Sequence, residues 1–258
     1  FDFADYLEKS RNRVEDALDA SLGPERPEKL RESMRYSLLA GGKRLRPILC
    51  LAACELAGGE VEKALPTAVA LEMIHTMSLI HDDLPCMDND KLRRGKPSTH
   101  IKFGESTAVL AGNSLLTLAF EILSYSGLKL NEKIKINLID KISKYSGHLG
   151  IAGGQYLDLD YEKKKISMRK IIEMEIKKTG KLFIFCCVAP LIIKRKSKQE
   201  ISKFENIGAD IGLLFQVADD LIDNKGSLLI AGKKTGKDKT KGKATLISLL
   251  GRKNTIKY

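Results

Sequence analysis

The sequence predicts an all-α fold, a helical bundle formed by a single domain. Apolar residues recur at helical spacing almost everywhere, for example at Val69, Met73, Met77 and Ile80. Strand-type alternation of apolar and polar residues is nearly absent. A chain of 258 residues, 43% of them hydrophobic, can bury one sizeable core. We therefore expect residues 1–258 to form one domain, and we expect that domain to lack part of its C-terminal helix.

Glycines, prolines and polar runs divide the chain into helical segments. Breaks are expected at Gly23-Pro24, Gly41-Gly42, Gly58-Gly59, 85–97, Gly153-Gly154, 161–166 and 224–242. Between these breaks we expect helices at 2–20, 28–39, 44–57, 61–84, 104–126, 131–149, 167–190 and 197–223. Helical bundles build metal and ligand sites from side chains that project inward from facing helices. The Lys- and Gly-rich segment 224–243 is a candidate lid.

Composition narrows the class of partner and the compartment. The 44 basic residues against 33 acidic ones leave a formal charge of +11, which suits an anionic partner, although most lysines coat solvated helix faces. The basic runs lack interleaved aromatics, so we expect no nucleic acid. The five cysteines have no CxxC spacing and indicate a reducing compartment without structural zinc. No stretch is long and apolar enough to predict an integral membrane segment.

Two aspartate clusters carry the chemical signal. In FQVADDLID, helical spacing places Asp219, Asp220 and Asp223 on one face, which Gln216 joins. The first cluster, in HDDLPCMDND, consists of Asp82, Asp83 and Asp88. A regular helix would point Asp88 away from Asp82. Because Pro85 disfavours helix in the residue before it, we expect the helix to finish near Leu84 and a loop to bring Asp88 back toward Asp82.

Carboxylates flanked by apolar helices are costly unless a cation lies between them. Hard oxygen ligands on facing helices suit magnesium, which completes its shell with water and substrate phosphates. Other interpretations remain open. One Asp pair at a helix end is usually a solvated terminus, and a carboxylate pair could act in acid–base catalysis, although six carboxylates exceed that need. An EF-hand calcium loop is disfavoured because DNDKLRRGK lacks the glycine that such a loop has at its sixth position, and lacks the distal Glu.

Basic residues lie where they could bind diphosphates. GGKRLRP combines a flexible turn, the cations Lys43, Arg44 and Arg46, and the free N–H groups of a helix start. Arg93 and Arg94 follow the first aspartate cluster directly. His75 precedes Asp82 by about two helical turns on nearly the same face, so core and ligand roles are equally open for it. The other histidines, His81, His100 and His148, are assigned structural roles.

These motifs together resemble the trans-isoprenyl diphosphate synthases. The likeness rests on GGKRLRP, LEMIHTMSLIHDDLPCMDND, LRRGKPSTH, Lys178-Thr179, FQVADDLID and Gly232-Lys233, in order and spacing, from about residue 36 to 251. Four residues separate Asp83 from Asp88, which is similar to the bacterial and plastid type of geranylgeranyl or farnesyl diphosphate synthase. The resemblance implies a polyprenyl synthetase domain of isoprenoid synthase type, with helices around a deep central cavity.

The resemblance also implies roles for individual residues. Isopentenyl diphosphate would be held by Lys43, Arg46, His75 and Arg94. The allylic diphosphate (dimethylallyl, geranyl or farnesyl) would be held by Arg93, Lys178, Thr179, Gln216, Lys233 and Lys243. Three Mg²⁺ ions would be bound principally by Asp82, Asp88 and Asp219, with Asp83, Asp220 and Asp223 as direct or water-mediated ligands. Lys178 and the six aspartates would form the catalytic set.

Product length depends on the residues just before the first aspartate cluster. Ser78 lies one helical turn before Asp82, and Met77 is adjacent to it. Farnesyl-producing relatives commonly have an aromatic residue here, whereas Met and Ser leave room for a longer tail. We therefore favour geranylgeranyl diphosphate, with farnesyl diphosphate as the alternative. The family also implies a homodimer, which we expect in the cytoplasm, or in a plastid if an upstream targeting segment has been removed.

The sequence departs from the family pattern at two places, and two other functions remain as alternatives to this interpretation. The segment 223–227 lacks a Gly-Asp pair that some relatives carry, and Asn113 replaces a frequent Asp. A terpene cyclase would use one diphosphate and would not need GGKRLRP or a second DDxxD-like motif. A non-catalytic partner subunit of a prenyl diphosphate synthase would not need intact aspartate clusters.

Overall fold

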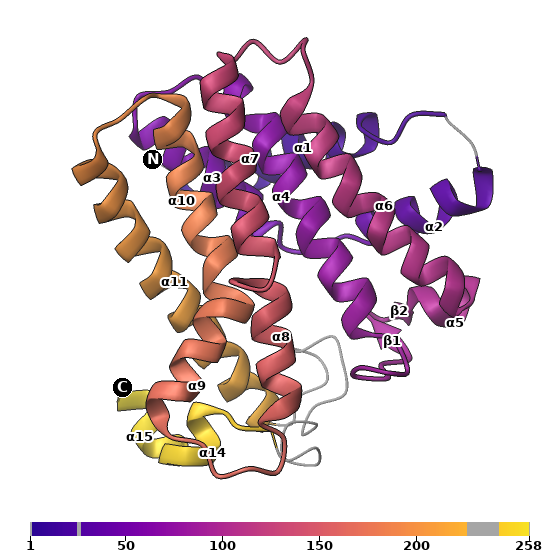
Figure 1. Cartoon of the computed structure of the whole chain (residues 1–258), viewed down its shortest axis with the longest axis vertical. Helices are drawn as coiled ribbons and strands as arrows, with labels where there is room; N and C mark the ends of the chain where they lie inside the picture. Colours follow the sequence, from indigo (N-terminus) through magenta and orange to yellow (C-terminus); the bar gives the residue numbers. More distant parts are fainter. Residues whose placement is uncertain (1, 25–26, 226–242, 258) are drawn as a thin grey trace. The chain divides into compact units, whose positions relative to one another are not determined.

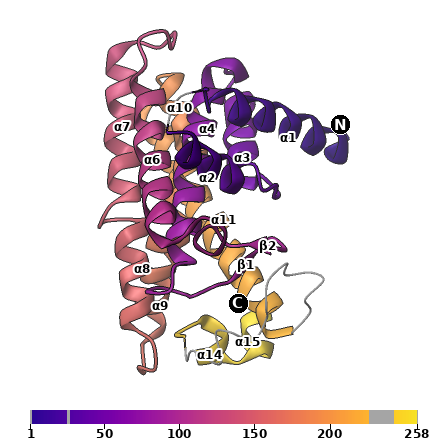
Figure 2. The same cartoon turned by 90° about the vertical axis from the view of Figure 1, so that its right-hand side faces the viewer.

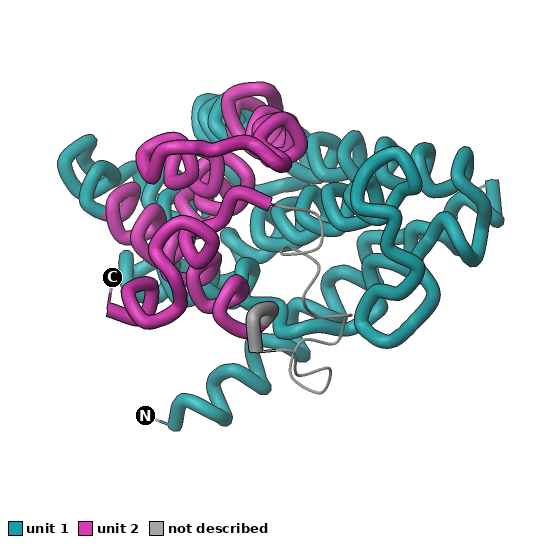
Figure 3. Tube along the Cα trace, turned by 90° about the horizontal axis from the view of Figure 1, so that it is seen from below, with its two compact units in different colours: residues 1–141, 186–203 teal, residues 142–185, 204–258 magenta. Residues whose placement is uncertain are grey.

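The computed structural model describes residues 2–24, 27–225 and 243–257, without the side chains of 223–225. The chain divides into two compact units, residues 1–141 with 186–203 and residues 142–185 with 204–258 (Figure 3). The first unit contains α1 (Phe3–Ala20), α2 (Glu28–Leu38), α3 (Leu45–Leu56), α4 (Val61–Asp82), α5 (Thr99–Phe103) and α6 (Glu105–Ser124). The second contains α8 (Ile151–Asp160), α9 (Met168–Glu175), the π-helical turn η1 (Ile176–Gly180), α14 (Leu246–Leu250) and α15 (Arg252–Lys257). Residues of both units make up α7 (Glu132–Ser146), α10 (Lys181–Ile193) and α11 (Lys198–Lys225).

Helix α4 is the centre of the first unit. It packs against α1, α2, α3 and α6, and α4 and α6 lie side by side in Figure 1. A helix that is apolar on nearly every face needs such cover. Its Leu71, Met73 and Ile74 are fully buried. Gly112 of α6 allows the close approach, because a Cβ there would lie 2.2 Å from Nε2 of His81.

The aspartate loop after α4 leads into a short antiparallel hairpin. Its strands are β1 (Leu92–Arg93) and β2 (Lys96–Pro97), with Leu92 opposite Pro97 and Arg93 opposite Lys96. The two turn residues, Arg94 and Gly95, have φ of 52° and 76°. Two positive φ values in a two-residue loop match the twist of paired strands. The turn therefore presents the Arg94 side chain from a fixed backbone.

The second unit is organised around η1. This turn packs against α8 and α9, and α14 packs beneath α9, as Figure 2 shows. A small core joins Ile171, Val217, Ala244 and Leu246. The wide turn is flanked by glycines: a Cβ on Gly154 of α8 would lie 2.2 Å from the backbone N of Lys178. A Cβ on Gly212 of α11 would lie 2.6 Å from Cα of Gly180.

The all-α prediction is confirmed, and most predicted helices are present with ends shifted by a few residues. The break expected at Gly153-Gly154 is wrong, because α8 runs through both glycines. Their lack of side chains serves the packing of α8 against η1 rather than a turn. The segment expected as one helix at 167–190 contains η1, and α10 continues to Ile193. Helices α5, α8, α14 and α15 and the hairpin are not among the predicted elements.

Helix α6 is the one described helix that is long and apolar enough to cross a membrane by length and composition. Its mean hydropathy is 1.4 over 18 residues, a third of which are buried. Core helices of globular proteins meet the same criterion, and α6 packs along α4. Its other face exposes Val109 and Leu110.

Candidate active site

The first aspartate cluster is held by a loop that folds back on the end of α4. The backbone N–H of Asp88 donates to the carbonyl of Asp82 at 2.8 Å, and that of Asp90 donates to the carbonyl of Asp83 at 3.1 Å. The predicted return of Asp88 toward Asp82 after Pro85 is therefore confirmed. Both Asp82 and Asp88 keep part of their surface accessible.

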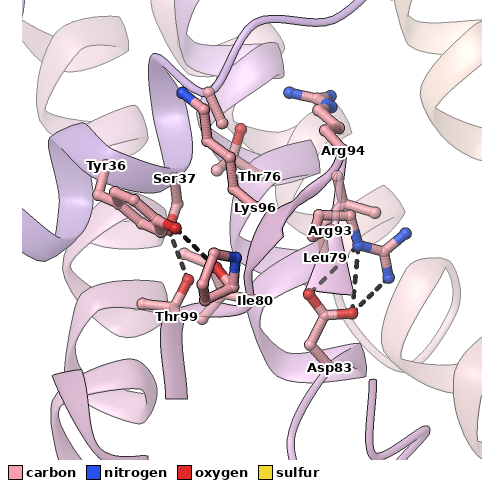
Figure 4. Close-up of a pocket in the computed structure, with 12 residues that line it drawn as sticks. Tyr36, Ser37, Thr76, Leu79, Ile80, Asp83, Arg93, Arg94, Lys96 and Thr99 are labelled. Atoms are coloured by element: carbon pink, nitrogen blue, oxygen red, sulfur yellow. Dashed lines mark hydrogen bonds and ion pairs between the residues drawn. The ribbon is translucent and has the colours of Figure 1, made fainter. Parts of the chain in front are cut away.

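Asp83 differs from Asp82 because it is 2% exposed and paired with Arg93. Nε of Arg93 lies 3.2 Å from each carboxylate oxygen, and Nη2 makes a further hydrogen bond (Figure 4). Burial raises the pKa of Asp83, while Arg93 opposes this rise. Asp83 as a metal ligand and Arg93 as a ligand of the allylic diphosphate stay predictions. In the structure these two residues bind each other.

Arg46, His75 and Arg94 form a basic cluster in the first unit. Nη1 of Arg46 lies 3.4 Å from Nε2 of His75. Burial, followed by the charges of Arg46, Arg94 and Arg93, lowers the pKa of His75 well below its usual value. His75 is therefore a neutral hydrogen-bonding group beside cations. Burial likewise lowers the pKa of Arg94.

The backbone around Lys43 comes close to this cluster. Arg94 donates to the carbonyl of Gly41, and a Cβ on Gly42 would lie 2.7 Å from Cζ of Arg94. Lys43 is exposed on the same loop. All four residues assigned to isopentenyl diphosphate thus belong to one unit, and the structure brings at least three of them together.

A second basic cluster lies in the second unit around Asp158. Nζ of Lys178 donates to Oδ2 of Asp158 at 2.7 Å, and Nζ of Lys243 donates to the same oxygen at 2.9 Å. Burial would raise the pKa of Asp158, but Lys178 and Lys243 lower it below its usual value. Two residues predicted to hold the allylic diphosphate, 65 positions apart in sequence, are therefore neighbours.

A chain of hydrogen bonds runs from η1 to the second aspartate cluster. The hydroxyl of Thr179 donates to Oε1 of Gln216 at 3.0 Å, and Nε2 of Gln216 donates to Oδ1 of Asp220 at 2.8 Å. Asp220 is buried, whereas Asp219 is partly exposed. The predicted shared face of Gln216 and Asp220 is confirmed. The side chain of Asp223, and Lys233, lie outside the described residues.

Asp158 and Glu175 are polar residues that the motif analysis missed. Glu175 is 4% exposed at the end of α9, and burial, then Asp220 and Asp158, raise its pKa to about 8. The available signal for Asp158 was the polar pair Gln155 and Asp158, three residues apart in an apolar stretch and therefore on one helix face. The sequence near Glu175 gives no such signal, because the role of Glu175 depends on segments distant in sequence that pack around it.

The predicted chain-length residues lie on α4. Met77 is 8% exposed, and the hydroxyl of Ser78 donates to the carbonyl of His75 at 2.9 Å. Asn113, which replaces a frequent Asp, is exposed on α6. The convergence of Asp82 of the first unit with Asp219 of the second stays a prediction.

The donor chemistry of the aspartate clusters fits a divalent cation. Carboxylate oxygens are the ligands that Mg²⁺-like ions prefer. In the part of the chain that the structure describes, no three Asp, Glu, His or Cys side chains gather closely enough to hold an ion alone. Such ions complete their coordination with water and with substrate phosphates.

An all-helical fold with two aspartate-rich motifs, each in a unit that also holds a cationic cluster, defines a helical enzyme of diphosphate chemistry. The polyprenyl synthetase family matches residues 27–256. A dimethylallyltranstransferase of Fischerella ambigua (strain UTEX 1903) is 45% identical over 254 residues, 97% of this chain and 73% of that protein. Geranylgeranyl pyrophosphate synthase 4 of Arabidopsis thaliana is 45% identical over 97% of this chain and 68% of its own length.

Solved structures agree with these relatives. The crystal structure of an FPP/GFPP synthase from Zymomonas mobilis is 40% identical, with a TM-score of 0.87 over 97% of this chain and 86% of that chain. A geranyltranstransferase from Thermotoga maritima is 37% identical, with a TM-score of 0.82 and the same coverage. The chain belongs to the polyprenyl synthetase family and has the isoprenoid synthase fold. It is a prenyltransferase that depends on a divalent metal ion.

Proposed function

We propose that this enzyme condenses isopentenyl diphosphate with an allylic diphosphate and releases geranylgeranyl diphosphate. The observation that carries the proposal is the presence of two cationic clusters, one in each unit. Arg46, His75 and Arg94 form one, and Lys178 and Lys243 belong to the other. Two clusters suit two diphosphate substrates, whereas a terpene cyclase binds one. The relatives named as geranylgeranyl diphosphate synthases support the C20 product.

The first cluster would bind isopentenyl diphosphate, which must stay intact. Arg46 and Arg94 supply planar guanidinium donors that suit phosphate oxygens. Neutral His75 donates one hydrogen bond without adding charge. Lys43, exposed on the neighbouring loop, completes the set of donors. None of these groups needs to exchange a proton with the substrate.

The second cluster would bind the allylic diphosphate, which must leave. Lys178 and Lys243, with Lys233 and Arg93 as the further residues assigned to this substrate, would draw negative charge toward the leaving group as the allylic C–O bond ionises. Asp82, Asp88 and Asp219 would hold the Mg²⁺ ions, three of them by the family pattern, and the bound metal would supply charge stabilisation for that diphosphate. The Thr179–Gln216–Asp220 hydrogen bonds orient the surrounding side chains.

The alkene of isopentenyl diphosphate then attacks the allylic cation, forming the new C–C bond. The product alkene forms when a proton leaves the adjacent carbon, and the released diphosphate accepts that proton. The protein therefore needs no general base. Its contribution is to bind both substrates, to orient the alkene, and to keep water from the cation.

Product length would be set on α4. Met77 and Ser78 precede Asp82 on the same helix, and neither carries an aromatic ring that would close the path of a growing tail. This favours the C20 product over farnesyl diphosphate.

We further propose that both units form one domain around a central cavity. Val109 and Leu110, exposed on α6, support a homodimer through that face. The dimer would work in the cytoplasm, or in a plastid after removal of a targeting segment.

A product assay with Mg²⁺, isopentenyl diphosphate and each short allylic primer tests the proposal. We expect a C20 diphosphate from the chain alone and no turnover without isopentenyl diphosphate. Asp82→Ala and Asp219→Ala should each lower kcat by about 100-fold or more without loss of folding, because each removes charge stabilisation of the leaving group. Asp5→Ala, at an exposed aspartate paired with Lys9, is the control and should retain full activity.

Other outcomes would select other functions. Turnover of an allylic diphosphate alone would indicate a cyclase. Activity that requires an added synthase would indicate a partner subunit. A dominant C15 product would contradict the open tail path at Met77 and Ser78, and near-normal activity of Asp82→Ala would contradict the metal assignment.

A further inference from the structure

Arg44 is the most deeply buried cation of GGKRLRP, at 2% exposed against 8% for Arg46. Its side chain is 0% exposed, whereas the neighbouring Lys43 is exposed. Arg44 also has a left-handed backbone, with φ of 48°, which is uncommon for a residue other than glycine. A guanidinium with no exposed surface, whose N–H groups are bonded to protein oxygens, cannot meet a diphosphate. The structure therefore separates Arg44 from the substrate-binding cations on either side of it in the sequence.

The guanidinium of Arg44 ties three elements together. Nε and Nη2 donate to the two carboxylate oxygens of Glu15 on α1, at 2.7 and 3.1 Å. Nη1 donates to Glu72 on α4 at 2.8 Å. Nη2 also donates to the carbonyl of Leu38, the last residue of α2, at 2.6 Å. This is the planar, forked geometry that arginine alone provides.

The charges around Arg44 are balanced locally. Glu72 is 2% exposed and would be costly to bury without a partner. Burial would lower the pKa of Arg44, but Glu15 and Glu72 raise it above its usual value. The same two carboxylates act on Arg94, which is half-buried nearby. The charges of two carboxylates thus act on two arginines, one that is buried and one that belongs to the basic cluster.

Arg44 also determines where α3 begins. It is the N-cap of this helix, and its carbonyl accepts from the N–H of Ile48 at 3.0 Å. Arg46 lies in the first turn of α3, where Nη1 reaches His75. From the other side, Arg94 holds Gly41 and Gly42. The loop that carries Lys43 is therefore fixed at both ends by arginine side chains.

We propose that Arg44 is a positioning residue for isopentenyl diphosphate. Its buried bonds hold the loop 41–44 and the first turn of α3, so that Lys43 and Arg46 are in place before the substrate arrives. This inference rests on the proposed assignment of Lys43 and Arg46 to that substrate. Pre-organised donors bind without the entropic cost of ordering a loop. Loss of Arg44 should thus weaken binding of one substrate and leave the chemical step unchanged.

Steady-state kinetics of Arg44→Lys test the proposal. Lysine keeps the charge but lacks the fork that bridges Glu15, Glu72 and Leu38. We expect KM for isopentenyl diphosphate to rise about tenfold, with kcat and the allylic KM within about twofold of wild type. A residue that only stabilised the fold would lower kcat with the active fraction of enzyme and leave both KM values unchanged. That pattern would overturn the proposal.

Two further variants keep the test decisive. Glu15→Gln is the milder change, because the Glu15 side chain is 31% exposed, and it decides the matter if Arg44→Lys does not fold. It should raise KM for isopentenyl diphosphate about threefold, and an unchanged KM would refute the proposal. Arg35→Lys is the matched control, since Arg35 joins α2 to Asp19 of α1 on the surface. An equal rise of KM in this control would also refute it. A wild-type enzyme without saturable dependence on isopentenyl diphosphate would instead refute the proposed function.

Discussion

Substitution of Gly154 tests whether the close packing of α8 on η1 positions the second cationic cluster. In Gly154→Ala the new Cβ would lie 2.2 Å from the backbone N of Lys178 and 2.5 Å from its Cα. Ordinary contact begins at 3.4 Å, so the backbones must separate by about 1.2 Å. Backbone atoms cannot rotate away as the end of a flexible side chain can. The strain must therefore move η1 itself.

The overlap at residue 154 sets the expected losses of stability and of activity. Alanine gains about 1 kcal/mol over glycine in a helix. Overpacking of a rigid contact costs up to about 3 kcal/mol, so the net loss of stability should be about 2 kcal/mol. Because a misplacement of about 1 Å can cost about 100-fold in rate, and Lys178 and Thr179 move with η1, kcat/KM for the allylic diphosphate should fall by about that factor.

The assay combines denaturant unfolding with steady-state kinetics, and the chain offers a matched control. Gly180 is the last residue of η1, and a Cβ on it would have no neighbour closer than 3.6 Å. Gly180→Ala should therefore be neutral or stabilising by up to about 1 kcal/mol, with full activity. If Gly154→Ala matched Gly180→Ala in both stability and kcat/KM, the packing argument would be refuted.

Two further predictions concern Glu175 and Ser78. The pKa of Glu175 is raised from 4.5 to about 8, so its contribution to stability is complete below pH 4.5 and is lost as pH rises toward 8, at up to about 1.4 kcal/mol per pH unit. The free energy of unfolding, measured in EDTA at pH 5 and at pH 8, should fall with pH in wild type and not in Glu175→Gln. An equal change with pH in both proteins would contradict this prediction. Ser78→Phe should shift the main product from C20 to C15 by chromatography, and an unchanged product would remove Ser78 from the tail path.

Much of the local structure was predictable because its causes are local. The apolar periodicity of α4 reflects a helix covered on most faces, and this pattern is visible in one segment. The return of Asp88 to Asp82 follows from the geometry of Pro85, which acts on its immediate neighbours. The shared face of Gln216 and Asp220 follows from helical spacing alone.

The glycines show where local reasoning fails. Gly153 and Gly154 have the composition of a turn, yet both lie inside α8. The reason is the backbone of Lys178, which no pattern near residue 154 reveals. The same limit applies to Arg44, which belongs to a phosphate-binding motif by sequence but is buried against Glu15 and Glu72.

The helical class, the family and the residue types for diphosphate and metal chemistry could be predicted without coordinates, because periodicity and motif spacing are properties of the chain. Which of those charged groups face each other is established by the folded structure. Asp83 is bound by Arg93, Asp158 joins Lys178 to Lys243, and Arg44 is withdrawn from solvent. These pairings arise from the packing of segments distant in sequence, where burial makes an unpaired charge too costly to keep.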